Sequence, residues 1–218
     1  FEGIQFLVEN PYWEGAKISL YSAGEESIAS MPNIKVGKFI TQVILQNIEV
    51  EDIDLSNATD LRSAWVQNNP ALQKLDLSYS TIWGQGDKET EGNGTYGSSL
   101  MVLGCPIQKE IKLPEKNELK AYRIDIECLD ALETFDMSNV KMVAELSIGD
   151  LNKDFNLVYP ELTIFYSEDG YAGTYFACSE NTFYRESTQS FLKANYTDIY
   201  PDYTVRRLGY TSSKTYDK

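Results

Sequence analysis

The sequence predicts a mainly β or α/β fold, built as an irregular solenoid of short parallel strands with segments outside the repeat at both ends. The first observation is that Val50-x-x-Ile53-x-Leu55 and Leu72-x-x-Leu75-x-Leu77 share one apolar spacing, 22 residues apart. Such a period is typical of units that contribute one short strand each and bury it by stacking on the next unit. The second observation is a globular composition, with 42% hydrophobic residues and 15 tyrosines, and without an apolar run as long as a membrane span.

Residues 1–45 are predicted to form an N-terminal β cap. They contain strand-like runs at residues 4–8, 16–21 and 39–45, and these runs do not fit the repeat. A solenoid leaves its apolar core open at each end and needs an atypical segment to close it. We therefore expect residues 1–45 to close the N-terminal end.

Residues 46–168 are predicted to form the solenoid itself. Further segments that fit the template are Leu100-x-x-Leu103-x-Cys105, Leu119-x-x-Tyr122-x-Ile124, Val143-x-x-Leu146-x-Ile148 and Tyr159-x-x-Leu162-x-Ile164. Another fit, Leu132-x-x-Phe135-x-Met137, lies only 11 residues before the Val143 unit, so one of this pair is expected on the outer side. The template predicts one continuous buried stack of Leu75, Leu77, Leu103, Ile124, Leu146 and Ile148.

Two connections interrupt this pattern. Residues 84–97 are rich in glycine and polar residues, which indicates an exposed loop. Residues 58–70 place Leu61, Ala64 and Trp65 at helical spacing, so we expect one or two helical turns there, on the outer side of the solenoid.

The segments LQKLDLSYSTI at residues 72–82 and LETFDMSNVKM at residues 132–142 resemble leucine-rich repeats, in particular the irregular kind of bacterial cell-surface proteins. The resemblance covers roughly residues 46–168. The chain departs from the family at the ninth position, where the usual Asn or Cys is replaced by Ser80 and Val140. Because that residue normally hydrogen-bonds the backbone of the turn after the strand, a regular horseshoe is not expected.

Residues 169–218 are predicted to form a C-terminal cap rich in tyrosine. Ten of the 15 tyrosines lie at or after Tyr159. Tyrosine combines a flat apolar ring with a polar tip and loses little rotamer entropy, so these side chains suit a carbohydrate or protein contact surface. The alternative, which we favour, is that they cover the last repeat, because the end of a solenoid has to be closed.

The charge of the chain argues against several partners. Its 218 residues include 19 Lys and Arg against 33 Asp and Glu, a formal net charge of −14. Such a charge repels phosphate backbones and anionic lipids, so nucleic acid and membrane surfaces are poor partners. The same charge favours the solubility of a secreted or surface protein.

The three cysteines, Cys105, Cys128 and Cys178, lie 23 and 50 residues apart and include no Cys-x-x-Cys pair. This spacing argues against a metal site or a redox motif. One disulfide with one remaining thiol is an open arrangement. Three buried thiols that act as small apolar residues are the arrangement we favour.

The absence of histidine excludes catalysis through Ser-His-Asp or Cys-His arrangements, and it excludes His-ligated zinc. Paired carboxylates can serve a glycosidase, and the candidates are Glu51, Asp52, Asp54, Asp125 and Glu127. Such residues beside strands usually form a solvated face. The string from Asp150 to Glu161 mimics the oxygen spacing of a calcium loop, but Phe155 stands where the tight turn needs glycine. We therefore expect no catalytic residue, metal or cofactor.

A concave face lined by the strands would present the residues between the template positions. The first unit is acidic at these positions and the fourth unit is basic, a pattern that orients a polar partner by charge. The candidate binding residues are Asp52, Asp54, Lys74, Asp76, Lys120, Arg123 and Glu145.

The function we favour is a non-enzymatic protein-binding or adhesion module of an exported bacterial protein, located outside the cell or on its surface. A lipid anchor upstream of Phe1 is one route of attachment. Two other classes stay open. A carbohydrate-binding module would use Trp13, Trp65, Trp83 or the tail tyrosines as stacking platforms. A glycan-degrading enzyme would need two facing carboxylates in a cleft.

Overall fold

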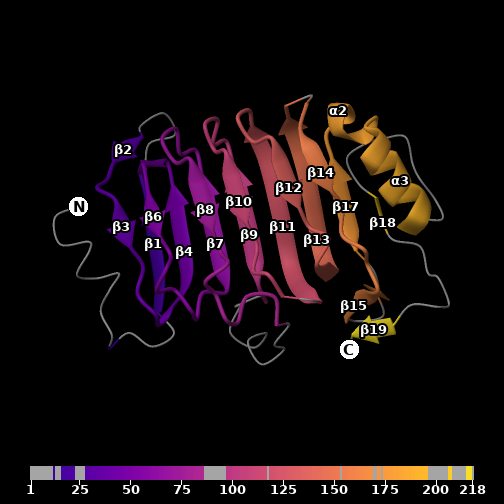
Figure 1. Cartoon of the computed structure of the whole chain (residues 1–218), viewed down its shortest axis with the longest axis horizontal. Helices are drawn as coiled ribbons and strands as arrows, with labels where there is room; N and C mark the ends of the chain where they lie inside the picture. Colours follow the sequence, from indigo (N-terminus) through magenta and orange to yellow (C-terminus); the bar gives the residue numbers. More distant parts are fainter. Residues whose placement is uncertain are drawn as a thin grey trace.

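The computed structural model describes residues 12, 16–22, 28–85, 97–116, 118–152, 154–168, 171–172, 174–195, 206–207 and 215–217. Its main element is an eight-stranded sheet, here called the large sheet (Figure 1). In spatial order its strands are β1 (Ala16–Tyr21), β4 (Ile40–Gln46), β7 (Ser63–Gln67), β9 (Ser99–Leu103), β11 (Leu119–Leu129), β13 (Val140–Leu151), β17 (Tyr175–Cys178) and β18 (Arg206–Arg207). The first seven strands are parallel, and β18 pairs with β17 in the antiparallel direction.

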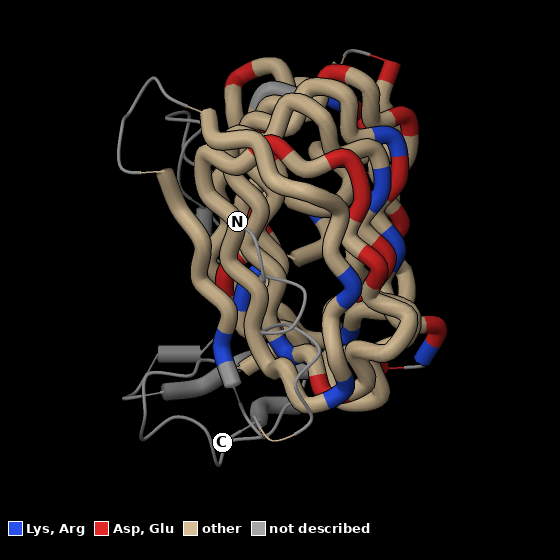
Figure 2. The backbone as a smooth tube through the Cα atoms, turned by 90° about the vertical axis from the view of Figure 1, so that its left-hand side faces the viewer, with Lys and Arg blue, Asp and Glu red and all other residues tan. Residues whose placement is uncertain are grey.

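A second layer of short strands lies opposite the large sheet (Figure 2). These strands form parallel pairs: β2 (Ala29–Ser30) with β5 (Ile48–Glu49), β3 (Ile34–Lys35) with β6 (Ile53–Asp54), β8 (Lys74–Asp76) with β10 (Glu110–Lys112), and β12 (Thr134–Asp136) with β14 (Asn156–Val158). Along the chain, each large-sheet strand from β1 to β13 is followed by short strands before the next large-sheet strand begins. The mainly β architecture with parallel strands agrees with the sequence prediction.

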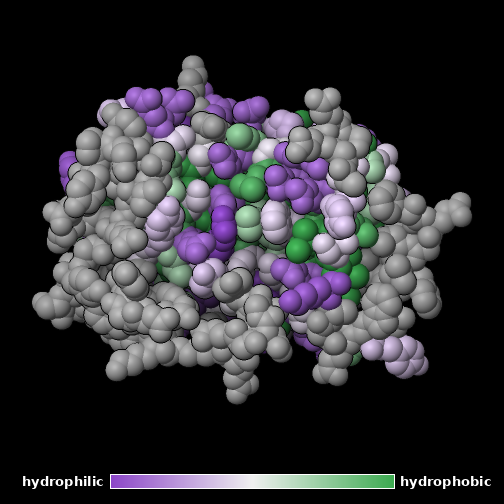
Figure 3. All heavy atoms as spheres, turned by 180° about the vertical axis from the view of Figure 1, so that it is seen from behind, coloured by the Kyte–Doolittle hydropathy of each residue, from purple (hydrophilic) through white to green (hydrophobic). Residues whose placement is uncertain are grey.

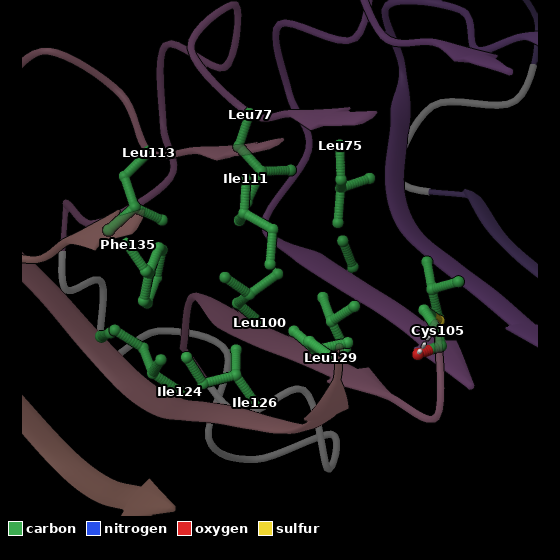
Figure 4. Packing of buried hydrophobic residues seen from close by; sticks show 14 of the residues in the cluster. Leu75, Leu77, Leu100, Cys105, Ile111, Leu113, Ile124, Ile126, Leu129 and Phe135 are labelled. Carbon is green, nitrogen blue, oxygen red and sulfur yellow. Dashed lines mark hydrogen bonds between the residues drawn. The ribbon is translucent and has the colours of Figure 1, made fainter. Parts of the chain in front are cut away.

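Both layers direct apolar side chains into one core between them, because alternate residues of a strand point to the same face. In the large sheet, register aligns Val43, Ala64, Leu100, Ile124 and Leu146 in one row, and Leu45, Val66, Val102, Ile126 and Ile148 in a second row. The short strands contribute Ile34, Ile53, Leu75, Ile111, Phe135 and Leu157. Figure 4 shows members of the two layers, such as Leu75 and Ile111 above Leu100 and Ile126, facing each other across this core.

The L-x-x-L-x-L spacing recurs throughout the short-strand layer. The segments of this layer that follow it are Met31-x-x-Ile34-x-Val36, Val50-x-x-Ile53-x-Leu55, Leu72-x-x-Leu75-x-Leu77, Gln108-x-x-Ile111-x-Leu113 and Leu132-x-x-Phe135-x-Met137, and all of these positions are buried. The predicted units that begin at Leu100, Leu119 and Val143 lie instead on β9, β11 and β13 of the large sheet.

Five of the six residues predicted to form one buried stack are buried in the same core, but they come from two layers. Leu75 and Leu77 belong to the short-strand layer, whereas Ile124, Leu146 and Ile148 belong to the large sheet. Leu103 is only half-buried, because it pairs in register with Gln67 and Glu127 on the side of the sheet that faces away from the core. The units at Leu132 and Val143 can be close in sequence because both point inward from opposite layers.

Residues 58–70 contain strand β7 and form no helical turn. Ala64 and Val66 are buried, while Trp65 between them is half-buried and points away from the core. This two-residue alternation overrides the helical spacing of the apolar side chains. After the strand, the Asn69 side chain accepts hydrogen bonds from the N–H groups of Ala71 and Leu72 at 2.9 and 3.0 Å, which turns the chain toward the short-strand layer.

Each layer uses its own recurring turn. After β4, β7 and β9, the backbone enters the left-handed region at Asn47, Asn68 and Gly104, with φ of 55°, 53° and 61°, and Cys128 near the end of β11 has φ of 55°. After three short strands, an Asp side chain accepts a hydrogen bond from the N–H two residues later, in the pairs Asp54–Ser56, Asp76–Ser78 and Asp136–Ser138, at 2.8 to 3.0 Å. At the ninth template position, buried Ser80 donates to the carbonyl of Leu61 at 2.7 Å, so it does bond the backbone of a neighbouring turn.

The helices of the described part, α2 (Glu180–Phe183) and α3 (Glu186–Asn195), lie at the C-terminal end of the core (Figure 1). The ring of Tyr159 stacks on Phe191 with centroids 4.5 Å apart, and Phe176 meets Phe191 edge to face at 5.6 Å. Burial raises the pKa of Tyr159, whose hydroxyl lies 2.9 Å from that of Thr188. Tyr159 is thus partly buried and packs against the core.

Three further strands form a small sheet that is separate from the large sheet. A small sheet of β15 (Ile164–Glu168), β16 (Tyr171–Ala172) and β19 (Thr215–Asp217) lies near the C-terminus. Of the tail tyrosines, Tyr175 and Tyr184 are exposed, and Tyr196, Tyr200, Tyr203 and Tyr210 lie outside the described residues, as do residues 86–96 of the predicted loop. In the described part, every helix is too short or too polar to cross a membrane. The division into a solenoid and two caps stays a prediction.

Candidate binding face of the large sheet

The side chains of the large sheet that point away from the core line up in rows across the strands. Register places Ile44 beside Trp65, Trp65 beside Met101, Met101 beside Asp125, and Asp125 beside Ser147. We call these five residues the central row. Asp125 is 5% exposed, and the other four are half-buried. Part of a tryptophan and part of a methionine are therefore accessible on a sheet surface.

Two flanking rows border the central row and carry mostly polar groups. On one side register aligns Gln42, Ser63, Ser99, Arg123 and Glu145, and on the other side Gln46, Gln67, Leu103, Glu127 and Gly149. We call the three rows together the outer face. In the view from behind, apolar side chains gather near the middle of this face between hydrophilic ones (Figure 3).

A charged network occupies one end of the outer face. The Arg123 guanidinium donates from Nη2 to Asp125 Oδ2 at 2.8 Å, and its Nη1 lies 3.5 Å from Glu145 Oε2. The Tyr122 hydroxyl donates to Glu145 Oε1 at 3.2 Å. A single guanidinium therefore holds two carboxylates of neighbouring strands, and these three side chains carry a net charge of −1.

Two polar atoms of the central row are buried without a hydrogen-bond partner among the described residues. They are Trp65 Nε1, which can only donate, and Asp125 Oδ1, which can only accept. Buried polar atoms are nearly always paired, and an unpaired one destabilises the fold by about 1–3 kcal/mol. Two such atoms in one row, separated by Met101 alone, are a feature that the packing of the core does not explain.

The predicted binding residues are divided between the two layers. Asp52, Asp54, Lys74 and Asp76 lie at the short-strand layer, whereas Lys120, Arg123 and Glu145 lie on the large sheet. Because the core separates the two layers (Figure 2), these residues do not form the single charged face that was expected. Whether each of them binds a partner stays a prediction.

Several charges of the short-strand layer are paired with one another. Lys74 Nζ lies 3.3 Å from Asp76 Oδ2 and 3.4 Å from Glu110 Oε2, and Lys112 Nζ lies 2.9 Å from Glu110 Oε1. The hydrogen bond from Lys112 lowers the pKa of Glu110, and Asp76 raises the pKa of Lys74. Between β10 and β12 a groove of about 430 Å³ is lined by side chains of both signs. Such exposed pairs contribute little stability and select no ion of one sign.

Several other candidates from the sequence are not suited to binding. Trp83 is completely buried, so it cannot serve as a stacking platform, and Trp13 lies outside the described residues.

Cys105 and Cys178 are buried but Cys128 is exposed, so the prediction of three buried thiols is wrong for Cys128. Cys128 lies near the end of β11 with φ of 55°, between Glu127 and Leu129, which pair with Gly149 and Leu151 of β13.

The calcium-like string does not come together as one site in the described residues. Its last carboxylate, Glu161 Oε2, lies 3.0 Å from Lys141 Nζ, and the side chain of its first residue, Asp150, is not described. Asn152 donates its side-chain N–H to the carbonyl of Asp130 at 3.1 Å. Among the described residues, no three His, Cys, Asp or Glu side chains are placed to hold a metal ion.

No family model, curated protein or solved structure matches this chain. The functional argument therefore depends on the chemistry of the outer face. The sequence predicted Trp65 and Arg123 as separate candidates, but it did not single out Ile44, and Asp125 was considered only as a catalytic carboxylate. Because the outward residues Ile44 and Trp65 are themselves apolar, polarity does not alternate along 40–46 or 63–67, and no clear signal in the sequence points to this face.

Proposed function

We propose that this chain is a non-enzymatic binding or adhesion module of an exported bacterial protein, and that it engages its partner through the outer face. The observation that carries the proposal is the central row, in which half-buried Trp65 and Met101 lie beside the network of Arg123. An apolar strip with polar borders is typical of a surface that meets a partner, since aromatic, Met and Arg side chains are enriched in interfaces.

The described residues place no helix over the middle strands of this face, and this supports the proposal. Parallel sheets in proteins are usually covered on both faces. Here one face of the large sheet packs on the short-strand layer, but neither helix of the described part lies over β4, β7 or β9 (Figure 1). A partner that lies on the outer face would complete the covering.

The architecture we propose is an irregular leucine-rich-repeat-like solenoid. The alternation of the chain between two layers supports it, as does the recurrence of one apolar spacing in the short-strand layer. Two recurring turns also support this architecture. They are the left-handed turns after large-sheet strands and the Asp-x-Ser turns after short strands. Binding on an extended sheet surface is the common use of such solenoids.

A binding role accounts for the carboxylates better than a catalytic one. Asp125 and Glu145 share one guanidinium, and Asp54 lies 3.6 Å from Lys35 and accepts from the N–H of Ser56. A glycosidase needs one carboxylic acid and one carboxylate that face each other across a sugar ring. Carboxylates held side by side on a sheet by one arginine do not have this arrangement.

The partner we propose is a protein or a glycan outside the cell. The formal net charge of −14 disfavours nucleic acid and anionic membranes. A protein is the partner expected from the resemblance to leucine-rich repeats. Trp65 favours a glycan as the second candidate, because its ring is partly open on a flat surface.

The test is a binding screen of the whole chain against arrayed glycans and arrayed extracellular protein domains. We expect at least one partner to be retained by the natural chain and lost with Trp65→Ala. The matched control is Tyr79→Ala, which removes an aromatic ring that is 49% exposed in the turn after β8. If Trp65→Ala folds normally and keeps every interaction while Tyr79→Ala loses them, the outer face is not the binding surface.

A further inference from the structure

We draw no further inference here: the strongest candidate, the groove of about 430 Å³ between β10 and β12 of the short-strand layer, is lined by side chains of both signs, and nothing in the structure shows which ligand or partner occupies it.

Discussion

Cys128 occupies a backbone conformation that its three counterparts reach at lower cost. The equivalent turns after β4, β7 and β9 place Asn47, Asn68 and Gly104 in the left-handed region, and Cys128 has the same conformation with φ of 55°. For a residue with a Cβ atom, this conformation costs roughly 1–2 kcal/mol of conformational free energy. The cost is absent for Gly, and it is smaller for Asn than for most other residues. Cys128 is exposed, so its side chain can be changed without opening the core.

We therefore expect Cys128→Asn and Cys128→Gly to stabilise the fold. The gain should be about 0.5–1 kcal/mol, because Asn relieves only part of the strain and Gly gives some of it back through the greater freedom of the unfolded chain. For a chain of this size, such a gain raises the melting temperature by about 1–4 °C. The assay is thermal unfolding followed by circular dichroism, with urea unfolding as a second measurement.

The matched control is Cys128→Ala, which removes the thiol but keeps the Cβ atom and hence the strain. It should leave the melting temperature close to that of the natural chain. If Cys128→Ala stabilises as much as Cys128→Gly, the effect comes from loss of the thiol. The reasoning from backbone geometry is then refuted.

Three further predictions concern packing and thiol chemistry. Leu75→Ala should lower the free energy of unfolding by about 2–5 kcal/mol, measured in urea, because its side chain is 1% exposed. Gly104→Ala should destabilise by about 1–3 kcal/mol, because φ is +61° and a Cβ atom would lie 2.6 Å from Asn68 Oδ1; an unchanged urea midpoint would contradict this. Burial raises the pKa of Cys105 from 9.0 to about 11. The buried, neutral Cys105 thiol therefore contributes its full stabilisation below pH 9, and this stabilisation is lost as the pH rises toward 11. Mass spectrometry after alkylation should find Cys128 modified before Cys105.

The short-strand layer could be predicted from the sequence in much of its detail. Three inward residues at one spacing, as in Leu72, Leu75 and Leu77, form a conspicuous pattern, and this pattern recurs where the chain returns to the same layer. The segment Gln108-x-x-Ile111-x-Leu113 was missed, because buried Gln108 is polar at a position where the spacing calls for an apolar residue. The mistake was to assign later matches such as Leu103 to the same layer.

The large sheet was harder to predict because its strands present polar residues and Trp65 on the face away from the core. Ala64 and Trp65 fit a helical spacing as well as a strand, and only tertiary pairing with β4 and β9 decides between the two. The central row could not be predicted at all. It depends on the register between strands of different units, and local sequence does not determine that register.

The measurement that tests the binding face most directly is hydrogen–deuterium exchange of the whole chain, with and without the partner that the arrays retain. We predict added protection in peptides that cover β4, β7, β9, β11 and β13, with no change in those that cover β8, β10 and β12, because the first group of strands carries the outer face and the second group does not. Protection confined to the short-strand layer, with residues 40–46, 63–67 and 99–103 unchanged, would contradict the account.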